Sequence, residues 1–160
     1  MRKLATAVVA VALGLMACGP RLIPGTNIEA TEDNEAILRV VADYKTAYEA
    51  KDVPGILKLV SPKFYETNGT PDPSDDYDYK GLERILTDEF KAVAQPALDL
   101  DVRKVSVARN SEDKASVDYY YASRFQLADA GANGGFKTAA DVAEMKLARE
   151  NGSWKITGGI

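Results

Sequence analysis

The hydrophobic period of this chain changes once, near Pro96, and that change constrains the fold more than any other feature. Before Pro96, which is expected to end the last helix, apolar residues recur every three to four positions, as along helices that bury one face. After it they alternate with polar residues, which is typical of half-buried strands. This order predicts an α+β fold, with three N-terminal helices packed on a curved, cone-shaped antiparallel sheet of four to five strands.

Three helices are expected in the first half of the chain. The first starts near Asn34, where Thr31 or Asp33 could cap it. The second starts at Asp52 and the third follows Gly81. Two helix faces carry the prediction: Ile37, Val40, Val41, Tyr44 and Tyr48 in the first helix, and Leu82, Ile85, Leu86, Phe90 and Val93 in the third.

The second half predicts strands joined by tight turns. The alternation slips by one position at Arg103-Lys104, and such a slip suggests a β-bulge that bends the sheet. A long strand is expected over residues 117–127. Asn151-Gly152 favours a hairpin turn before the last strand.

The N-terminus resembles a bacterial lipoprotein signal. Arg2 and Lys3 precede an apolar run, residues 4–16, that is too short to span a bilayer as an ordinary helix. It ends in "LMAC", which is similar to a lipobox with Cys18 as the acylated residue. We therefore expect a signal peptide over residues 1–17 and a lipid-anchored tether over residues 18–33. An ordinary secretory signal or a short membrane anchor is the alternative.

Acylation of Cys18 would make the lipid bilayer the first partner of the chain, because each buried methylene contributes about 0.8 kcal/mol. The next residue is Gly19 and not the aspartate that commonly retains lipoproteins at the inner membrane. The expected location is therefore the cell envelope, at the outer membrane and facing the periplasm. Residues 34–160 would form the single folded domain.

The composition excludes several classes of function. The chain has 24 acidic and 20 basic residues, and its net charge of −4 argues against a nucleic-acid partner. It contains no histidine, so the commonest general base and the usual serine–histidine and cysteine–histidine pairs are absent. No cofactor is expected.

An acidic stretch, "PDPSDDYDYKGLE", has the oxygen spacing of a calcium loop. Counted from Asp72 as position 1, side-chain oxygens occupy positions 1, 3, 5, 7 and 12, which is the spacing of that loop. However, Tyr77 stands where such a loop needs glycine, and Lys80 brings a cation to position 9. We therefore predict no metal and interpret the stretch as a loop whose acids cap the helix that follows. The residues assigned to this loop are Asp72, Asp76, Tyr77, Asp78 and Tyr79.

Three stretches together resemble the nuclear transport factor 2-like superfamily, which includes ketosteroid isomerase and the polyketide cyclases. They are "ILRVVADYKTAYEAKDVPGILKLVSPKFYE", "YKGLERILTDEF" and "MKLARENGSWKITGG". The resemblance implies a cone of curved sheet around a helix, with a pocket at its open end. It places the acidic stretch in the loop at the mouth of that cone, with Tyr77 and Tyr79 as the expected ligand contacts.

The same resemblance implies only part of a catalytic site. Tyr44 falls where ketosteroid isomerase has its oxyanion-hole tyrosine, and a phenol there can stabilise an enolate. The general-base position falls near Asn68, which cannot accept a proton at neutral pH, and Glu66 is the nearest substitute. The second acid falls near Ala143, next to Glu144. The resemblance thus supports the fold and leaves enzyme activity uncertain.

The remaining candidate residues would surround the interior of the cone. Aromatic walls with a few polar tips suit a small apolar or aromatic ligand. The alternative is that these side chains fill the cone and leave no pocket. The candidate pocket residues are Tyr44, Tyr48, Tyr65, Phe90, Tyr119, Tyr121, Phe125, Met145 and Trp154.

The functional prediction is a membrane-anchored domain that binds a small ligand or a protein and performs no catalysis. A lyase or isomerase that uses Tyr44 and a nearby carboxylate is the alternative from another class. An accessory subunit of an envelope complex is a third. Members of the superfamily often dimerise through the outer face of the sheet, and the residues expected on that face are Asp118, Tyr120, Ala122 and Arg124.

Overall fold

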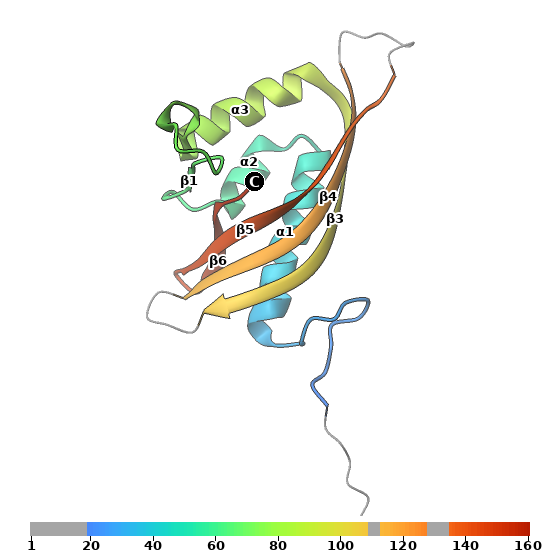
Figure 1. Ribbon diagram of the computed structural model, residues 1–160, viewed down its shortest axis with the longest axis vertical. Helices are drawn as coiled ribbons and strands as arrows, with labels where there is room; N and C mark the ends of the chain where they lie inside the picture. The colour runs from blue at the N-terminus through green and yellow to red at the C-terminus, as the bar shows by residue number, and fades with distance from the viewer. Residues whose placement is uncertain (1–18, 109–112, 128–134) are drawn as a thin grey trace, which may run out of the picture.

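A computed structural model of the chain describes residues 19–108, 113–127 and 135–160 (Figure 1). The predicted signal peptide and Cys18 lie outside the described residues. So do most of the predicted turn at residues 110–113 and most of the hairpin tip that follows the long strand.

Three α-helices form among the described residues of the first half of the chain, as the period predicts. They are α1 (Glu32–Glu49), α2 (Val53–Leu59) and α3 (Tyr79–Ala92). Each begins at a side-chain cap, which satisfies a backbone N–H that has no partner in the first turn. The caps are Thr31, which accepts from Asn34 N at 3.1 Å, Asp52, which accepts from Gly55 N at 3.0 Å, and Asp78, which accepts from Gly81 N at 2.9 Å.

The second half forms one antiparallel sheet of four strands, β3 (Val93–Ala108), β4 (Lys114–Leu127), β5 (Lys137–Glu150) and β6 (Ser153–Gly158), in that order. A second, two-stranded sheet pairs β1 (Tyr65–Glu66) with β2 (Tyr77–Asp78). The short 3₁₀ helix η1 (Pro73–Asp75) lies between β1 and β2 and belongs to the acidic stretch.

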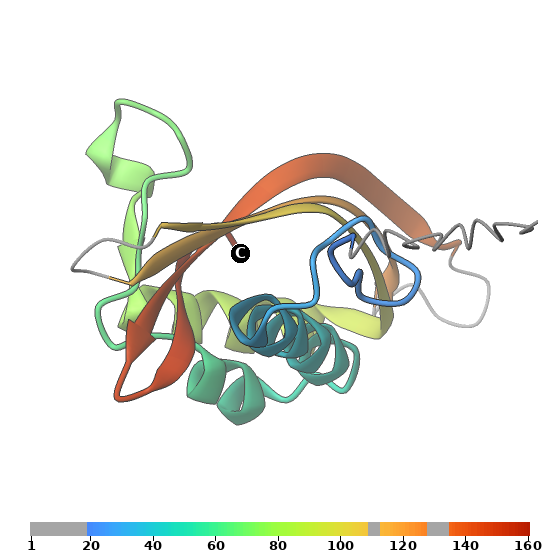
Figure 2. The same ribbon diagram turned by 90° about the horizontal axis from the view of Figure 1, so that it is seen from below.

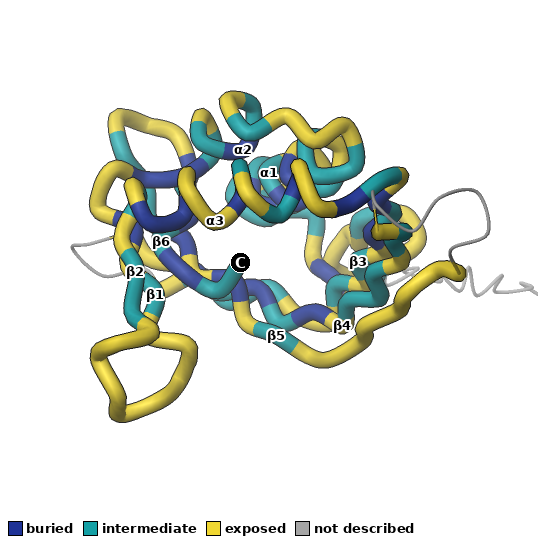
Figure 3. Tube along the Cα trace, turned by 90° about the horizontal axis from the view of Figure 1, so that it is seen from above, coloured by how far each residue is buried: buried dark blue, intermediate teal, exposed yellow. Residues whose placement is uncertain are grey.

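The large sheet arches over the helices, and the chain end at Ile160 lies between the two layers (Figure 2). Buried stretches of both layers face each other across this interior (Figure 3). The described residues form one hydrophobic core to which both layers contribute, and the predicted α+β cone is confirmed. Its fully buried side chains are Ile37, Ile56, Ser61, Phe64, Val117, Met145, Leu147 and Ile156.

The third helix and the first long strand agree with the sequence prediction in one detail and differ from it in two. The predicted bulge is present, as a register shift between Val102 and Lys104. Pro96, however, does not end the helix, because α3 already stops at Ala92 and Pro96 lies inside β3. It occupies a second bulge, next to Gln95 with φ of 51°, where a strand tolerates a residue without an N–H. Ile85, expected on the apolar face, is 44% exposed.

Part of the predicted tether is folded. Leu22 bridges to Glu29, and the N–H of Ile23 donates to the carbonyl of Ile28 at 2.8 Å. Ile28 is only 6% exposed, and burial of its side chain stabilises this small hairpin. Among the described residues no helix is both long and apolar enough to cross a membrane.

Candidate functional site

Aromatic side chains from three elements meet inside the cone. The α1 helix contributes Tyr44 and Tyr48, whose ring centroids are 6.2 Å apart. Phe90 of α3 lies edge-on to Tyr48 at 5.2 Å. Tyr119 and Tyr121 of β4 lie 6.5 Å apart. Tyr44, Phe90 and Tyr119 are buried, whereas Tyr48 and Tyr121 are half-buried, so the group reaches from the core to the open side of the cone.

A carboxylate that sequence reasoning missed lies among these rings. The hydroxyl of Tyr48 donates to Glu89 Oε1 at 2.6 Å, and Glu89 also acts electrostatically on Tyr44. Glu89 follows Leu82 by seven residues on α3, so it shares the helix face of Leu82 and Leu86. A charged residue within an otherwise apolar helix face was the signal that could have identified it.

The raised pKa values of Tyr44 and Tyr48 hold these two hydroxyls in their neutral form. The pKa of Tyr44 is raised, first by burial and then by repulsion from Tyr119, Tyr48 and Glu89. The pKa of Tyr48 is raised by burial and by its hydrogen bond to Glu89. Neutral phenols can donate hydrogen bonds, so these side chains can serve as polar tips in an apolar site.

Tyr119 leads to a prediction about alkaline pH. Burial raises the pKa of Tyr119 to about 12, with smaller contributions from Tyr121 and Glu66. An unfolded tyrosine loses its proton near pH 10, so above that pH the unfolded state releases protons first. The free energy of unfolding is therefore expected to fall as the pH rises from about 10 to about 12. Urea midpoints across this interval test it. Tyr119→Phe should make the fall shallower, and a constant wild-type midpoint would contradict the burial.

The last residues of the chain turn into the cone and are bound there. Tyr119 donates to the carbonyl of Gly159 at 3.0 Å, and Tyr77 donates to the carbonyl of Ile160 at 3.1 Å. The N–H of Gly159 donates to Glu66 Oε2, and Ile160 packs against the core. This segment therefore occupies part of the interior that the sequence assigned to a ligand.

Glu66, the candidate general base, is bound to backbone. Its Oε1 accepts from the N–H of Thr67 at 3.0 Å and of Asn68 at 3.2 Å, and its Oε2 accepts from Gly159. Three N–H groups thus fix this carboxylate beside the chain end. The carboxylate that acts on Tyr44 is Glu89 and not Glu66.

The acids of the mouth loop are engaged in local hydrogen bonds. Asp72 caps η1 by accepting from Ser74 N at 2.9 Å, and Asp76 accepts from the hydroxyl of Tyr65 at 2.7 Å. Asp78 caps α3, as predicted. Within the described ranges no group of three or more acidic, histidine or cysteine side chains could hold a metal ion. Asp72, Asp76 and Asp78 thus stabilise this stretch through hydrogen bonds to neighbouring residues.

Several candidate residues lie elsewhere. Tyr65 was grouped with the pocket residues, but it is 54% exposed and faces Asp76. The hydroxyl of Tyr79 turns toward α2 and donates to the carbonyl of Leu57 at 3.4 Å. Trp154 is buried beneath the guanidinium of Arg149, which lies 4.7 Å from the ring centre, and the indole N–H has no partner among the described residues.

Met145 and Phe125 differ in burial. Met145 is fully buried in the core, where it cannot contact a ligand at the cone mouth without rearrangement. Phe125 of β4 is half-buried and packs against the core from the side.

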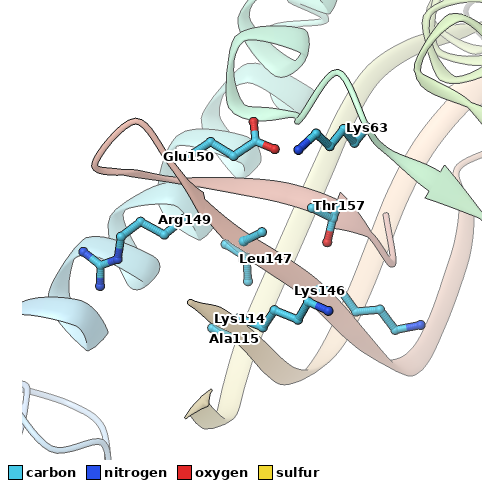
Figure 4. A pocket seen from close by; sticks show the side chains of 9 residues that line it. Lys63, Lys114, Ala115, Lys146, Leu147, Arg149, Glu150 and Thr157 are labelled. Carbon is cyan, nitrogen blue, oxygen red and sulfur yellow. The ribbon is translucent and has the colours of Figure 1, made fainter. Parts of the chain in front are cut away.

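One cavity of the described surface lies away from the aromatic group. It has a volume of about 630 Å³ and opens near the β5–β6 hairpin (Figure 4). Four further cavities of about 350–610 Å³ lie on the described surface, and their linings do not include Tyr44 or Tyr121. The lining of the first cavity consists of Lys63, Lys114, Ala115, Lys146, Leu147, Ala148, Arg149, Glu150 and Thr157.

Comparison with known proteins finds likeness in structure alone. No protein-family model and no curated protein matches the chain. A ketosteroid isomerase-like protein from Erwinia carotovora atroseptica aligns with a TM-score of 0.63 and 18% identity, over 81% of this chain and 94% of its own. A nuclear transport factor 2-like superfamily protein from Salmonella enterica serovar Typhimurium aligns with a TM-score of 0.62 and 15% identity, over 78% and 86%.

A third structure, a conserved protein from Planctomyces limnophilus, aligns with a TM-score of 0.66 and 12% identity, over 79% of this chain and 92% of its own. At these identities the likeness speaks for the fold and not for an activity. The chain has the nuclear transport factor 2-like fold.

Proposed function

We propose that this protein is a lipid-anchored envelope domain whose cone binds a small apolar or aromatic ligand without catalysis. One observation carries the non-catalytic part. Glu66, the carboxylate nearest to the general-base position, accepts three backbone hydrogen bonds and holds the chain end in place. A base must instead reach the proton that it abstracts.

The aromatic group supports the binding part of the proposal. Tyr48 and Tyr121 are half-buried and border a core of buried rings, which is the apolar wall with polar tips that small-molecule sites use. A ligand would pack beside Ile160 or displace it, because that residue already lies against the core. Ligand binding and release of the chain end would then be coupled.

Fluorescence of a neutral aromatic dye, N-phenyl-1-naphthylamine, tests the cone as a binding site. Tyr121→Ala removes part of the proposed wall and is expected to weaken dye binding several-fold. Tyr120→Ala is the matched control, because Tyr120 is 38% exposed on the opposite face of the same strand. Equal loss in both variants, or no saturable binding to the wild type, would count against the cone as a ligand site.

Attachment to the membrane is proposed from the N-terminal sequence alone. The basic pair, the short apolar run and Cys18 in "LMAC" support processing and acylation at Cys18, with the domain at the outer membrane facing the periplasm. Detergent phase partition of the expressed protein tests this. The wild type is expected in the detergent phase, and the processed Cys18→Ser protein should not gain acyl-chain mass. An unmodified Cys18 in the mature wild type would overturn the proposal.

A lyase or isomerase remains the second candidate, and Glu89 is the observation that favours it. Its carboxylate lies within the aromatic group, bound by Tyr48 and acting on the buried Tyr44. A β,γ-unsaturated steroid ketone is the probe, with ultraviolet detection of the conjugated product. If the wild type turns the probe over, and Glu89→Gln loses that activity while Glu66→Gln keeps it, the protein is an isomerase that uses Glu89. Absence of turnover in the wild type supports the binding function.

A protein partner on the outer face of the sheet is a third candidate, either a second copy or an envelope complex that this chain serves as accessory subunit. Tyr120 lies directly opposite Val142 across β4 and β5, and Val142 is 72% exposed. Asp118 and Tyr120 alternate with the buried Val117 and Tyr119 on β4, and Ala122 and Arg124 continue the same spacing along the strand. Sedimentation velocity of the wild type should detect a dimer, and Val142→Asp should dissociate it. A monomeric wild type would exclude the second copy and leave only an envelope complex as the partner.

A further inference from the structure

The 630 Å³ cavity gathers positive charge from three segments of the chain. Lys114 and Lys146 extend from the neighbouring strands β4 and β5, and Lys63 comes from the loop after α2 (Figure 4). Arg149 lies beside them near the β5–β6 hairpin. The only acidic side chain in the lining is Glu150. This concentration of cations contrasts with the net charge of −4 of the whole chain.

The charges in the lining are not equally available. Arg149 is paired with Asp33 and, at 3.5 Å, with Asp113, and Glu150 accepts from the hydroxyl of Ser61 at 2.8 Å. In the described part of the chain, the side-chain ammonium groups of Lys63 and Lys146 form no ion pair or hydrogen bond, and the N–H of Lys63 donates to Ser61 Oγ at 2.9 Å. Two ammonium groups therefore remain to bind a ligand.

The register of the sheet brings two of the lysines together. Lys114 pairs with Ala148, and Lys146 pairs with Ser116, so the two lysines are diagonal neighbours on one face of β4 and β5. Such neighbours are about 7–8 Å apart, within reach of long side chains. One anion on this face can therefore reach side chains of both strands.

The floor of the cavity is apolar and its edge offers one hydroxyl. Ala148 forms the accessible part of the floor, because Ala115 and Leu147 beside it are buried in the core, and Thr157 lies on the β6 side with a hydroxyl that can donate or accept. An inorganic ion would leave most of this volume unused. An organic anion can place its charge among the lysines and its carbon atoms on the floor.

We propose that this cavity binds a phosphate-bearing organic anion. Ammonium groups on separate segments around one cavity suit a group with several charged oxygens, because each oxygen can accept from a different lysine. The lining of the site includes no residue of the aromatic group in the cone, and the proposal does not depend on what the cone binds. The anion is either a soluble phosphate ester or the headgroup of a phospholipid.

Calorimetric titration of the full chain with glycerol 3-phosphate tests the shared chemistry. Saturable binding is expected, and it should weaken as salt is added, because ion pairs at an open site are screened. The double variant K63Q/K146Q is expected to bind at least about tenfold more weakly, since it removes two charge-assisted contacts. K104Q is the matched control, because Lys104 is an exposed strand lysine that lies outside the linings of all five cavities. Circular dichroism establishes that each variant is folded.

Vesicles distinguish the two sources of phosphate. If the ligand is a lipid headgroup, wild type should bind phosphatidylglycerol vesicles more tightly than phosphatidylcholine vesicles, and K63Q/K146Q should lose that difference. The apolar N-terminal segment contributes equally to both proteins. If the ligand is soluble, the preference is absent and glycerol 3-phosphate binding persists. The absence of both effects, or equal binding by wild type and K63Q/K146Q in both assays, overturns the proposal.

Discussion

Replacing Gly159 with alanine is expected to lower the free energy of unfolding by about 3 kcal/mol. Gly159 has φ of +83°, a region that costs an L-residue about 1–2 kcal/mol. A Cβ at this position would also lie 1.9 Å from the carbonyl oxygen of Glu144 and 3.0 Å from the Cα of Met145. Both contacts are with backbone of β5, which cannot move aside as a flexible side chain would.

Gly152→Ala provides the matched control in urea unfolding. Gly152 has φ of +80° in the β5–β6 turn, but a Cβ there would meet nothing within 4 Å. Gly152→Ala should therefore lower the free energy of unfolding by only about 1 kcal/mol, the cost of the positive φ alone. If Gly159→Ala is no more destabilising than Gly152→Ala, that result would contradict the close contact between Gly159 and the backbone of β5.

The same substitution should change the interior of the cone. A side chain at position 159 displaces the segment that Tyr119 and Tyr77 bind through the carbonyls of Gly159 and Ile160. Those hydroxyls then lose their partners and the site becomes more open. A folded Gly159→Ala protein is thus expected to bind the neutral dye more tightly than wild type.

Replacing Phe64 with alanine is expected to lower the free energy of unfolding by about 3–5 kcal/mol. Phe64 is 2% exposed and follows α2, with its ring centroid 5.9 Å from that of Tyr77. Its removal leaves a cavity where the loop after α2, the small sheet and the core meet.

Phe136→Ala is the control for Phe64→Ala. Phe136 is 50% exposed, and its contact is the guanidinium of Arg124, 4.9 Å from the ring centre. Its truncation should change the urea midpoint little, because an exposed cation–π contact contributes about 0.5–1 kcal/mol. Similar losses in the two variants would contradict the assignment of Phe64 to the core.

Predictions from local pattern were accurate where backbone chemistry decides. Asp52 and Asp78 cap helices because a side-chain oxygen just before a helix satisfies a free N–H. The slip at Arg103-Lys104 marks a bulge because one extra residue in a strand shifts both the alternation of its side chains and its pairing with the neighbouring strand. Pro96 was misjudged because a proline that breaks a helix is equally tolerated at a strand bulge.

The candidate site was only partly predictable. Tyr44 and Tyr48 follow from one helix face, and Tyr119 and Tyr121 from one strand face. That Glu89 would bond to Tyr48, 41 residues away, depends on how α3 lies against α1. That Glu66 would bind the N–H of Gly159, 93 residues away, depends on where the chain end lies after β6.

The sequence by itself determined the order of helices and strands, the caps, the predicted bulge and the composition of the two faces of the sheet, because these follow from hydrogen bonding and hydrophobic period within a few residues. Only the tertiary structure decided which side chains meet. It brought Glu89 among the tyrosines, turned Gly159 and Ile160 into the cone, and gathered Lys63, Lys114 and Lys146 around one cavity. Such contacts join segments far apart in the chain, and they depend on how twisted layers pack rather than on any local pattern.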